Sequence, residues 1–183
     1  TRPVALVTGA SYGLGAAIAA RLAADGFDVA VTELDPADLA ETRAAIEAAG
    51  AQSEGVALDL RLDASIADAV TTTLEHFGRI DLLVNNAAML VAKPALEVVT
   101  AEFEAVTRIN VTGTFLITQH VGRHLIESGR PGQIINIAST FTTVGAVNVS
   151  PYGISKAAIG GLTRHLAAEW APHRVRVNAV APG

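Results

Sequence analysis

The 183-residue sequence predicts an α/β protein in which a mostly parallel, doubly wound sheet lies between two layers of helices. Short β-branched runs alternate with helical stretches along the whole chain. The runs show little alternation of apolar and polar residues, as expected for strands covered on both faces. No internal repeat, linker or block of like charge interrupts the pattern, which indicates one domain over residues 1–183.

The six predicted strands are short runs rich in Val, Ile and Leu. In chain order they occupy residues 4–8, 28–33, 53–59, 80–84, 133–138 and 174–180. Five helices are predicted between them, in residues 14–24, 37–49, 64–77, 100–128 and 152–170. Pro36 stands where a first helical turn tolerates proline, and Gly50, Gly78 and Gly129 each follow the end of a helix. Strands that alternate with helices of this length are expected to form right-handed βαβ units.

The composition excludes several classes of protein. The sequence contains no Cys, so it forms neither disulfides nor thiolate metal sites. A net charge of −5 disfavours a nucleic-acid surface, which requires clustered Lys and Arg. The mean hydropathy is +0.39, but no apolar run approaches the ~18 residues that span a membrane, and no signal peptide precedes the first strand. We therefore expect a cytoplasmic protein with no nucleic-acid or membrane partner.

The turn after the first strand, T-G-A-S-Y-G-L-G, is rich in glycine and leads directly into a helix. Glycine permits the tight turn and lets backbone N–H groups approach a pyrophosphate, which the helix N-terminus also attracts. An ordinary glycine-rich turn is the alternative, but the position between the first strand and the first helix favours a nucleotide site. The predicted contacts are Gly9, Ser11, Tyr12, Gly13, Leu14 and Gly15.

Tyr152 and Lys156 lie four residues apart in a predicted helix, so their side chains share one face. A free phenol has a pKa near ~10, and a nearby ammonium favours the phenolate and lowers this pKa. Tyr152 is therefore a candidate general acid/base for interconverting an alcohol and a ketone. The sequence has only two Tyr and two Lys, which makes chance a poor explanation for the spacing.

The loop T-G-x-x-x-G-x-G together with Y-x-x-x-K resembles the non-extended branch of the short-chain dehydrogenase/reductase family. The resemblance implies a Rossmann-type fold with six of the family's usual seven strands, and direct hydride transfer between a substrate carbon and a nicotinamide. It also implies the catalytic set Asn110, Ser139, Tyr152 and Lys156. Ser139 would hold the substrate oxygen, and Lys156 would also contact the nicotinamide ribose. Asn110 would help to hold a water linked to Lys156; the alternative is a satisfied polar group in a packed helix.

The cofactor is expected to be NAD(H), with NADP(H) as the alternative. Glu33 ends the second strand, where a carboxylate accepts hydrogen bonds from the adenosine ribose and repels a 2′-phosphate. Family members that use NADP often carry a basic residue where this chain has Tyr12. The competing interpretations are that Glu33 is only a solvated charge, or that Asp35 is the ribose partner.

Further cofactor contacts are implied by the resemblance alone. They are Asp59 and Leu60 beside the adenine, Asn86 and Ala87 under the cofactor, and Pro182 and Gly183 beside the nicotinamide. The family's N-N-A-G motif reads N-N-A-A here, with Ala88 in place of the glycine.

The expected function is NAD(H)-dependent interconversion of a secondary alcohol and a ketone. One alternative is an NADPH-dependent 3-oxoacyl-carrier-protein reductase. Another, of a different class, is a redox sensor that binds a dinucleotide without turnover. The small-molecule substrate is expected to meet a largely apolar wall that includes Thr140, Phe141, Val144 and Val147. Relatives often pair through two long helices, so a homodimer or homotetramer is expected.

Two expectations concern metals and chain length. His120 and His124 have the spacing of a metal-binding pair, but neither an H-E-x-x-H motif nor Cys accompanies them, so no metal site is expected. The resemblance covers residues 4–183 and stops where family members continue for roughly another quarter of their length. We therefore expect a C-terminal truncation that removes a substrate lid and a seventh strand.

Overall fold

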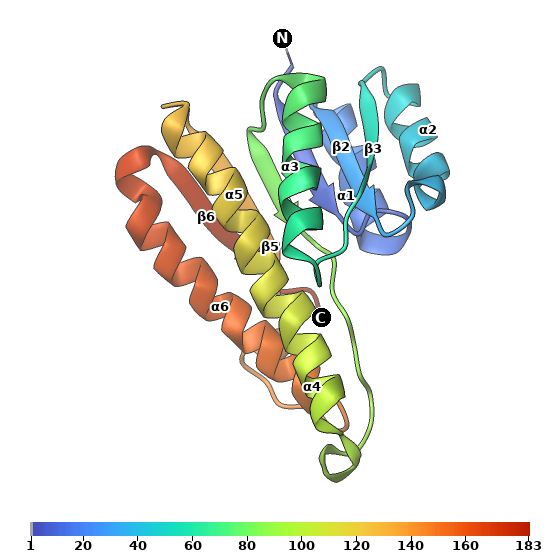
Figure 1. Ribbon diagram of the computed structural model, residues 1–183, viewed down its shortest axis with the longest axis vertical. Helices are drawn as coiled ribbons and strands as arrows, with labels where there is room; N and C mark the ends of the chain where they lie inside the picture. The colour runs from blue at the N-terminus through green and yellow to red at the C-terminus, as the bar shows by residue number, and fades with distance from the viewer. Residues whose placement is uncertain (1) are drawn as a thin grey trace.

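The computed structural model of the protein describes residues 2–183 as one six-stranded parallel sheet with helices on both faces (Figure 1). The strands are β1 (Val4–Thr8), β2 (Asp28–Glu33), β3 (Ser53–Ala57), β4 (Leu82–Asn85), β5 (Gly132–Ile137) and β6 (Val175–Val180). The helices are α1 (Gly13–Ala24), α2 (Ala40–Ala48), α3 (Asp63–Phe77), α4 (Thr100–Thr107), α5 (Thr114–Glu127) and α6 (Ser150–Trp170). The strand order β3-β2-β1-β4-β5-β6 reverses direction between β1 and β4, which confirms the predicted doubly wound, Rossmann-type class.

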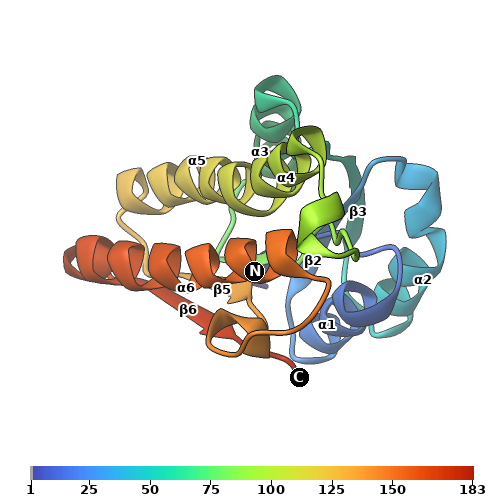
Figure 2. The ribbon, with the colours of Figure 1, turned by 90° about the horizontal axis from the view of Figure 1, so that it is seen from below.

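The helices form two layers, which Figure 2 shows from below. In β1, Ala5 and Val7 pack with α1 and α2 on one face of the sheet. Leu6, between them, packs on the opposite face with the cluster that contains residues of α3, α5 and α6. Both faces of the central strands are therefore buried, which explains why these strands show no polar alternation in the sequence.

Several strand and helix boundaries differ from the sequence prediction. The third strand ends at Ala57 instead of residue 59, and the fourth begins at Leu82 instead of residue 80. The helix predicted at 37–49 starts with a 3₁₀ turn, Pro36–Leu39, before α2 begins. The Asp35 side chain caps this turn by accepting a hydrogen bond from the Ala37 N–H at 2.9 Å. This cap gives the chain after β2 a fixed path.

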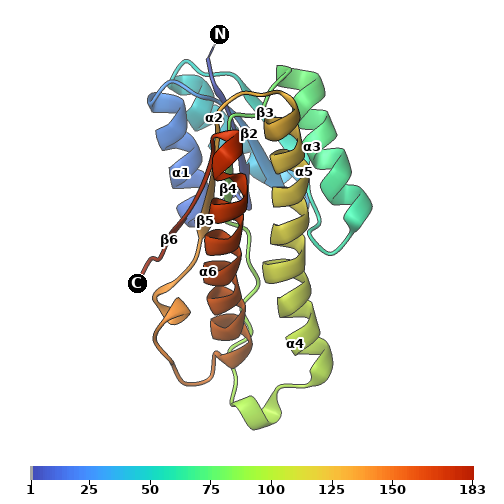
Figure 3. The same cartoon turned by 90° about the vertical axis from the view of Figure 1, so that its left-hand side faces the viewer.

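The long helical region predicted at 100–128 is present but contains a π-helical turn. In Figure 3, α4 and α5 follow one another as one long rod. The π turn, Arg108–Gly113, joins them and carries the predicted site residue Asn110. A Cβ on Gly113 would lie 2.7 Å from the Leu60 carbonyl oxygen, so glycine lets the turn pack closely against the segment after β3. Turns of this kind are frequent at functional sites.

No helix within residues 2–183 combines the length and the apolar character needed to cross a membrane. In the same part of the chain, no three His, Asp or Glu side chains gather where they could hold a metal ion. His124 has a structural contact: its Nε2 accepts a hydrogen bond from the Ile80 N–H at 3.3 Å. This bond joins α5 to the segment that leads into β4.

Candidate functional site

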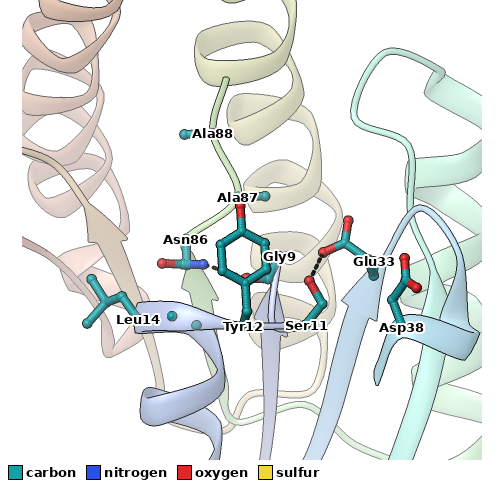
Figure 4. A pocket seen from close by; sticks show the side chains of 11 residues that line it. Gly9, Ser11, Tyr12, Leu14, Glu33, Asp38, Asn86, Ala87 and Ala88 are labelled. Carbon is teal, nitrogen blue, oxygen red and sulfur yellow. Dashed lines mark hydrogen bonds between the residues drawn. The ribbon is translucent and has the colours of Figure 1, made fainter. Parts of the chain in front are cut away.

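Nine of the predicted cofactor residues line a cavity of about 460 Å³ at the carboxyl ends of β1, β2 and β4 (Figure 4). This is the point where the strand order reverses, and ligands of doubly wound sheets bind there. The lining includes all six predicted residues of the glycine-rich loop, together with Glu33, Asn86 and Ala87. It also includes Asp38 and Ala88, which were not among the predicted cofactor contacts.

Three glycines shape the loop that forms one wall of the cavity. Gly9 has a φ of +64°, and a Cβ there would lie 2.9 Å from the Ala87 Cα. A Cβ on Gly15 would collide with the Gly9 carbonyl oxygen and lie 2.6 Å from the Asn86 Nδ2. Gly13 has a φ of +61° but no atom within 4 Å of its Cβ position. Glycine at Gly9 and Gly15 therefore lets the loop pack closely against Ala87 and Asn86, whereas Gly13 faces open space in the cavity lining and leaves its backbone accessible to a phosphate group.

The N-terminus of α1 points to the same cavity. Tyr12 occupies the N-cap position and makes no side-chain capping hydrogen bond, so its side chain satisfies none of the first N–H groups of the helix. The positive end of the helix dipole favours an anion at this position. The glycine backbone and the helix terminus together fit a pyrophosphate.

Asn86 fixes the end of β4 to the loop after β1. Its Nδ2 donates hydrogen bonds to the carbonyl oxygens of Thr8, at 3.0 Å, and Gly9, at 2.7 Å. In return the Thr8 Oγ1 accepts hydrogen bonds from the backbone N–H groups of Asn86 and Ala87, both at 3.0 Å. The floor of the cavity is therefore built from two strands that are distant in sequence.

Glu33 presents a carboxylate that neighbouring groups hold in place. Its Oε2 accepts a hydrogen bond from the Ser11 hydroxyl at 2.7 Å, and its Oε1 accepts one from the Leu34 N–H at 3.0 Å. Asp35 does not line this cavity, because its carboxylate caps the 3₁₀ turn instead. Of the two acidic residues that the sequence left in competition, only Glu33 faces the cavity.

A second cavity, of about 210 Å³, adjoins the first at Glu33, Ala87 and Ala88. Asp59 and Leu60 line it, as predicted, although they lie in the loop after β3. The Asp59 carboxylate accepts a hydrogen bond from the Arg61 Nη2 at 2.7 Å, and this guanidinium holds the pKa of Asp59 below its ordinary value. The prediction missed Arg61, which lines the same cavity.

Ser139, Tyr152 and Lys156 come together at the end of β5. The Ser139 side chain acts to lower the pKa of Tyr152, and its Oγ accepts a hydrogen bond from the Phe141 N–H at 3.2 Å. The Lys156 Nζ lies 5.4 Å from the centre of the Tyr152 ring and donates a hydrogen bond to the Ile137 carbonyl oxygen at 2.6 Å. Lys156 is only 4% exposed and Ser139 only 8%, so these polar groups are largely shielded from water. A Tyr hydroxyl beside a Ser hydroxyl and an ammonium can transfer a proton to or from a substrate oxygen.

The predicted lowering of the Tyr152 pKa by Lys156 is wrong for this structure. Burial raises the pKa of Tyr152, and the Ser139 side chain opposes this only in part. Burial also lowers the pKa of Lys156 to about 8, so the ammonium is itself destabilised by its surroundings. The Lys156 Nζ donates to the Ile137 carbonyl, and no attraction between Lys156 and the phenolate offsets the effect of burial on Tyr152.

The Asn110 side chain joins the segment after β4 to helix α6. It is 2% exposed, and its Oδ1 accepts a hydrogen bond from the Met89 N–H at 2.7 Å. Its Nδ2 donates to the Met89 carbonyl at 2.8 Å and to the Ser155 hydroxyl at 3.0 Å. Ser155 in turn donates to the Tyr152 carbonyl at 2.7 Å. Both Nδ2 protons are therefore used within the fold, and the part of Asn110 in holding a water linked to Lys156 stays a prediction.

The chain beyond β6 passes the end of β5, where Pro182 and Gly183 were predicted to lie beside the site. The Pro182 carbonyl accepts a hydrogen bond from the Thr140 N–H at 3.0 Å, next to Ser139. A Cβ on Gly183 would lie 3.3 Å from the Thr140 side chain. Both residues are thus close to Ser139, a member of the predicted catalytic set.

A third cavity, of about 370 Å³, lies between residues 141–149 and α6. Phe141 and Val144 line it as predicted, whereas Thr140 and Val147 do not. The Phe141 ring meets the Tyr152 ring edge-on, with 6.2 Å between their centres. None of the side chains that line this cavity carries a charge, in agreement with the expected apolar wall.

Comparison with known proteins gives four consistent likenesses. The family model of the short chain dehydrogenases matches residues 3–183. The short-chain reductase protein NovJ of Streptomyces niveus is 43% identical over 98% of this chain and 68% of its own length. The L-2,3-butanediol dehydrogenase of Corynebacterium glutamicum is 41% identical over 98% of this chain and 70% of its own length. The structure of an NAD⁺-bound xylitol dehydrogenase superimposes with a TM-score of 0.95 at 35% identity, over 99% of this chain and 70% of that one.

Proposed function

The chain belongs to the short-chain dehydrogenase family, and we propose that it interconverts a secondary alcohol and a ketone with NAD(H) as the cofactor. One observation carries this proposal: Ser139, Tyr152 and Lys156 meet at the carboxyl end of β5, on the same edge of the sheet as the glycine loop. A relative named for butanediol and a structural neighbour named for xylitol support a small alcohol as the substrate.

The residues present fit a dinucleotide. The glycine loop and the N-terminus of α1 would hold the pyrophosphate, because both line the cavity and no side chain caps the first N–H groups of the helix. Glu33 would bind the adenosine ribose, and its negative charge supports NAD(H) over NADP(H). When bound, the nicotinamide supplies or accepts the hydride.

The chain's own residues would orient the substrate and move the proton. The Ser139 hydroxyl would hold the substrate oxygen next to Tyr152. In reduction, the Tyr152 hydroxyl donates its proton to the oxygen of the former carbonyl; in oxidation, the phenolate removes the proton from the alcohol. Lys156 has a pKa of about 8 and lies beside the Tyr152 ring, so it can exchange a proton near neutral pH.

The two alternative functions have less support. A 3-oxoacyl-carrier-protein reductase that uses NADPH would bind a 2′-phosphate beside Glu33, yet no Lys or Arg lines the 460 Å³ cavity. A redox sensor without turnover would not need Ser139, Tyr152 and Lys156 to converge.

We also propose that two copies pair through α5 and α6, which carry the half-exposed apolar side chains Phe115 and Ile154.

The variant Tyr152→Phe tests the mechanism. It keeps the ring that packs against Phe141 but removes the hydroxyl, so kcat should fall by about 10²–10⁴-fold. The dissociation constant for NADH should stay within about twofold of the wild-type value. Calorimetric titration of variant and wild type measures this constant without turnover. Activity can be screened with secondary alcohols that include 2,3-butanediol and xylitol. Turnover that survives the substitution would show that Tyr152 does not move the proton.

A further inference from the structure

The part of the cofactor cavity next to β2 is lined by two carboxylates. Glu33 ends β2, and Asp38 follows in the 3₁₀ turn Pro36–Leu39. Figure 4 shows both carboxylates on the same side of the cavity, each projecting from its own segment of the chain. Sequence reasoning found Glu33 from its place at the end of a strand, but Asp38 had no such signal.

Among residues 2–183, no cation balances these two carboxylates within the cavity. Glu33 and Asp38 carry the only charged side chains among the described residues that line it. The nearest cation of the adjoining cavity, Arg61, is occupied by Asp59 through three hydrogen bonds of 2.7 to 3.1 Å from its side chain. The local charge that faces the adenosine end of the cavity is therefore negative.

The two carboxylates differ in how firmly they are held. Glu33 is fixed by Ser11 and by the backbone of Leu34, and it is only partly exposed. Asp38 is exposed, and its carboxylate accepts no hydrogen bond from any residue within 2–183. The turn that carries Asp38 is nevertheless fixed, because Asp35 caps it.

We propose that Asp38 is a second specificity-determining residue, which excludes an adenosine 2′-phosphate together with Glu33. The inference rests on the proposed function, since it assumes that the adenosine ribose lies at Glu33. A phosphate of charge near −2 placed roughly 6 Å from a carboxylate in a watery site loses about tenfold in affinity for each such carboxylate. The ribose of NAD(H) carries a neutral hydroxyl at this position and is not repelled.

The experiment is a calorimetric titration of NAD⁺ and NADP⁺ into the wild type and three variants, at low and at high salt. Asp38→Asn and Glu33→Gln each remove one charge from the cavity while keeping the size of the side chain. Glu41→Gln is the matched control, since Glu41 is exposed in the first turn of α2 and lines no part of the cavity. The quantity compared is the ratio of the Kd for NADP⁺ to the Kd for NAD⁺.

Asp38→Asn is expected to lower this ratio by about tenfold at low salt and by less at high salt, while Glu41→Gln leaves it unchanged. A ratio that Asp38→Asn leaves unchanged, although Glu33→Gln lowers it, would overturn the role of Asp38 and leave the NAD(H) preference intact. A wild type that binds NADP⁺ more tightly than NAD⁺ would overturn the proposed cofactor itself, and with it the inference about Asp38. The two failures are thus told apart by the wild-type titration alone.

Discussion

Replacing Lys156 by Met should stabilise the protein against unfolding while abolishing turnover. The pKa of Lys156 falls from its ordinary value of 10.5 to about 8, and this difference corresponds to about 3 kcal/mol spent on holding the charged form in the fold. Met has a similar length and no charge to bury. The variant loses the hydrogen bond to the Ile137 carbonyl, which costs about 1 kcal/mol. The free energy of unfolding should therefore rise by about 2 kcal/mol at pH 7.

The pH dependence of stability provides an independent check on Lys156. Its pKa in the folded state is lower than in the unfolded chain, so the folded state binds fewer protons between about pH 8 and pH 10.5. The destabilisation is complete below about pH 8 and is relieved as the pH rises through this window. Wild-type stability should therefore gain from this group between pH 8 and pH 10, and Lys156→Met should lose that gain.

Urea unfolding followed by circular dichroism at pH 7, 8, 9 and 10 measures both effects. The control is Lys93→Met, because Lys93 is the second lysine of the chain and pairs with Glu102 at the surface, at 2.6 Å. Loss of such a surface pair changes stability by less than about 1 kcal/mol. If Lys156→Met were less stable than the wild type at pH 7, or kept the same rise above pH 8, the assigned cost of burying Lys156 would be refuted.

Three further predictions concern the loop, the helix contact and pH. Gly15→Ala should lower the free energy of unfolding by about 3 kcal/mol and abolish NADH binding, because its Cβ collides with the Gly9 carbonyl oxygen. Gly13→Ala should lower the free energy of unfolding by only about 1–2 kcal/mol, since its Cβ meets open space and only the positive φ is costly. Equal losses in the two variants would contradict the packing argument. Ser155→Ala should cost about 1–3 kcal/mol in thermal unfolding, because a buried Asn110 amide proton loses its acceptor, and an unchanged Tm would count against that contact. Burial lowers the pKa of His124 below 6.5, so the stabilising contribution of the neutral imidazole is present above pH 6.5 and is lost as the pH falls. In urea unfolding, the stability of His124→Gln should therefore fall less between pH 7.5 and pH 5 than that of the wild type. If the variant lost as much stability as the wild type, another group would be responsible for the titration.

The fold and the central site residues were accessible from local sequence patterns. Continuous apolar runs reveal strands that are buried on both faces, and a glycine loop between a strand and a helix reveals a phosphate site without knowledge of tertiary contacts. Tyr152 and Lys156 could be paired because helical spacing alone places them on one face. Each of these signals lies within a few residues of the feature that it predicts.

The missed features depend on how distant or irregular segments meet. Asp38 lines the cavity from a 3₁₀ turn that replaces the first turn of the predicted helix. The π turn around Asn110 has the same apolar pattern as an α-helix, so the sequence gives no sign of it. The pKa of Tyr152 was predicted from its neighbour Lys156, but burial decides its direction, and burial is a property of the complete fold.

The contacts of Asn86 also bear on the order in which the chain folds during synthesis. Asn86 fixes the glycine loop through carbonyl oxygens that lie 77 and 78 residues earlier in the chain. A nascent chain that has released β1 and α1 from the ribosome therefore still lacks the amide that sets the final shape of the loop. Parallel pairing of β1 with β4 is a non-local contact, and such contacts form late and slowly. Intermediates that precede this pairing should be unable to bind the dinucleotide, so the cofactor would act as a ligand of the finished fold alone and protect it from proteolysis by mass action.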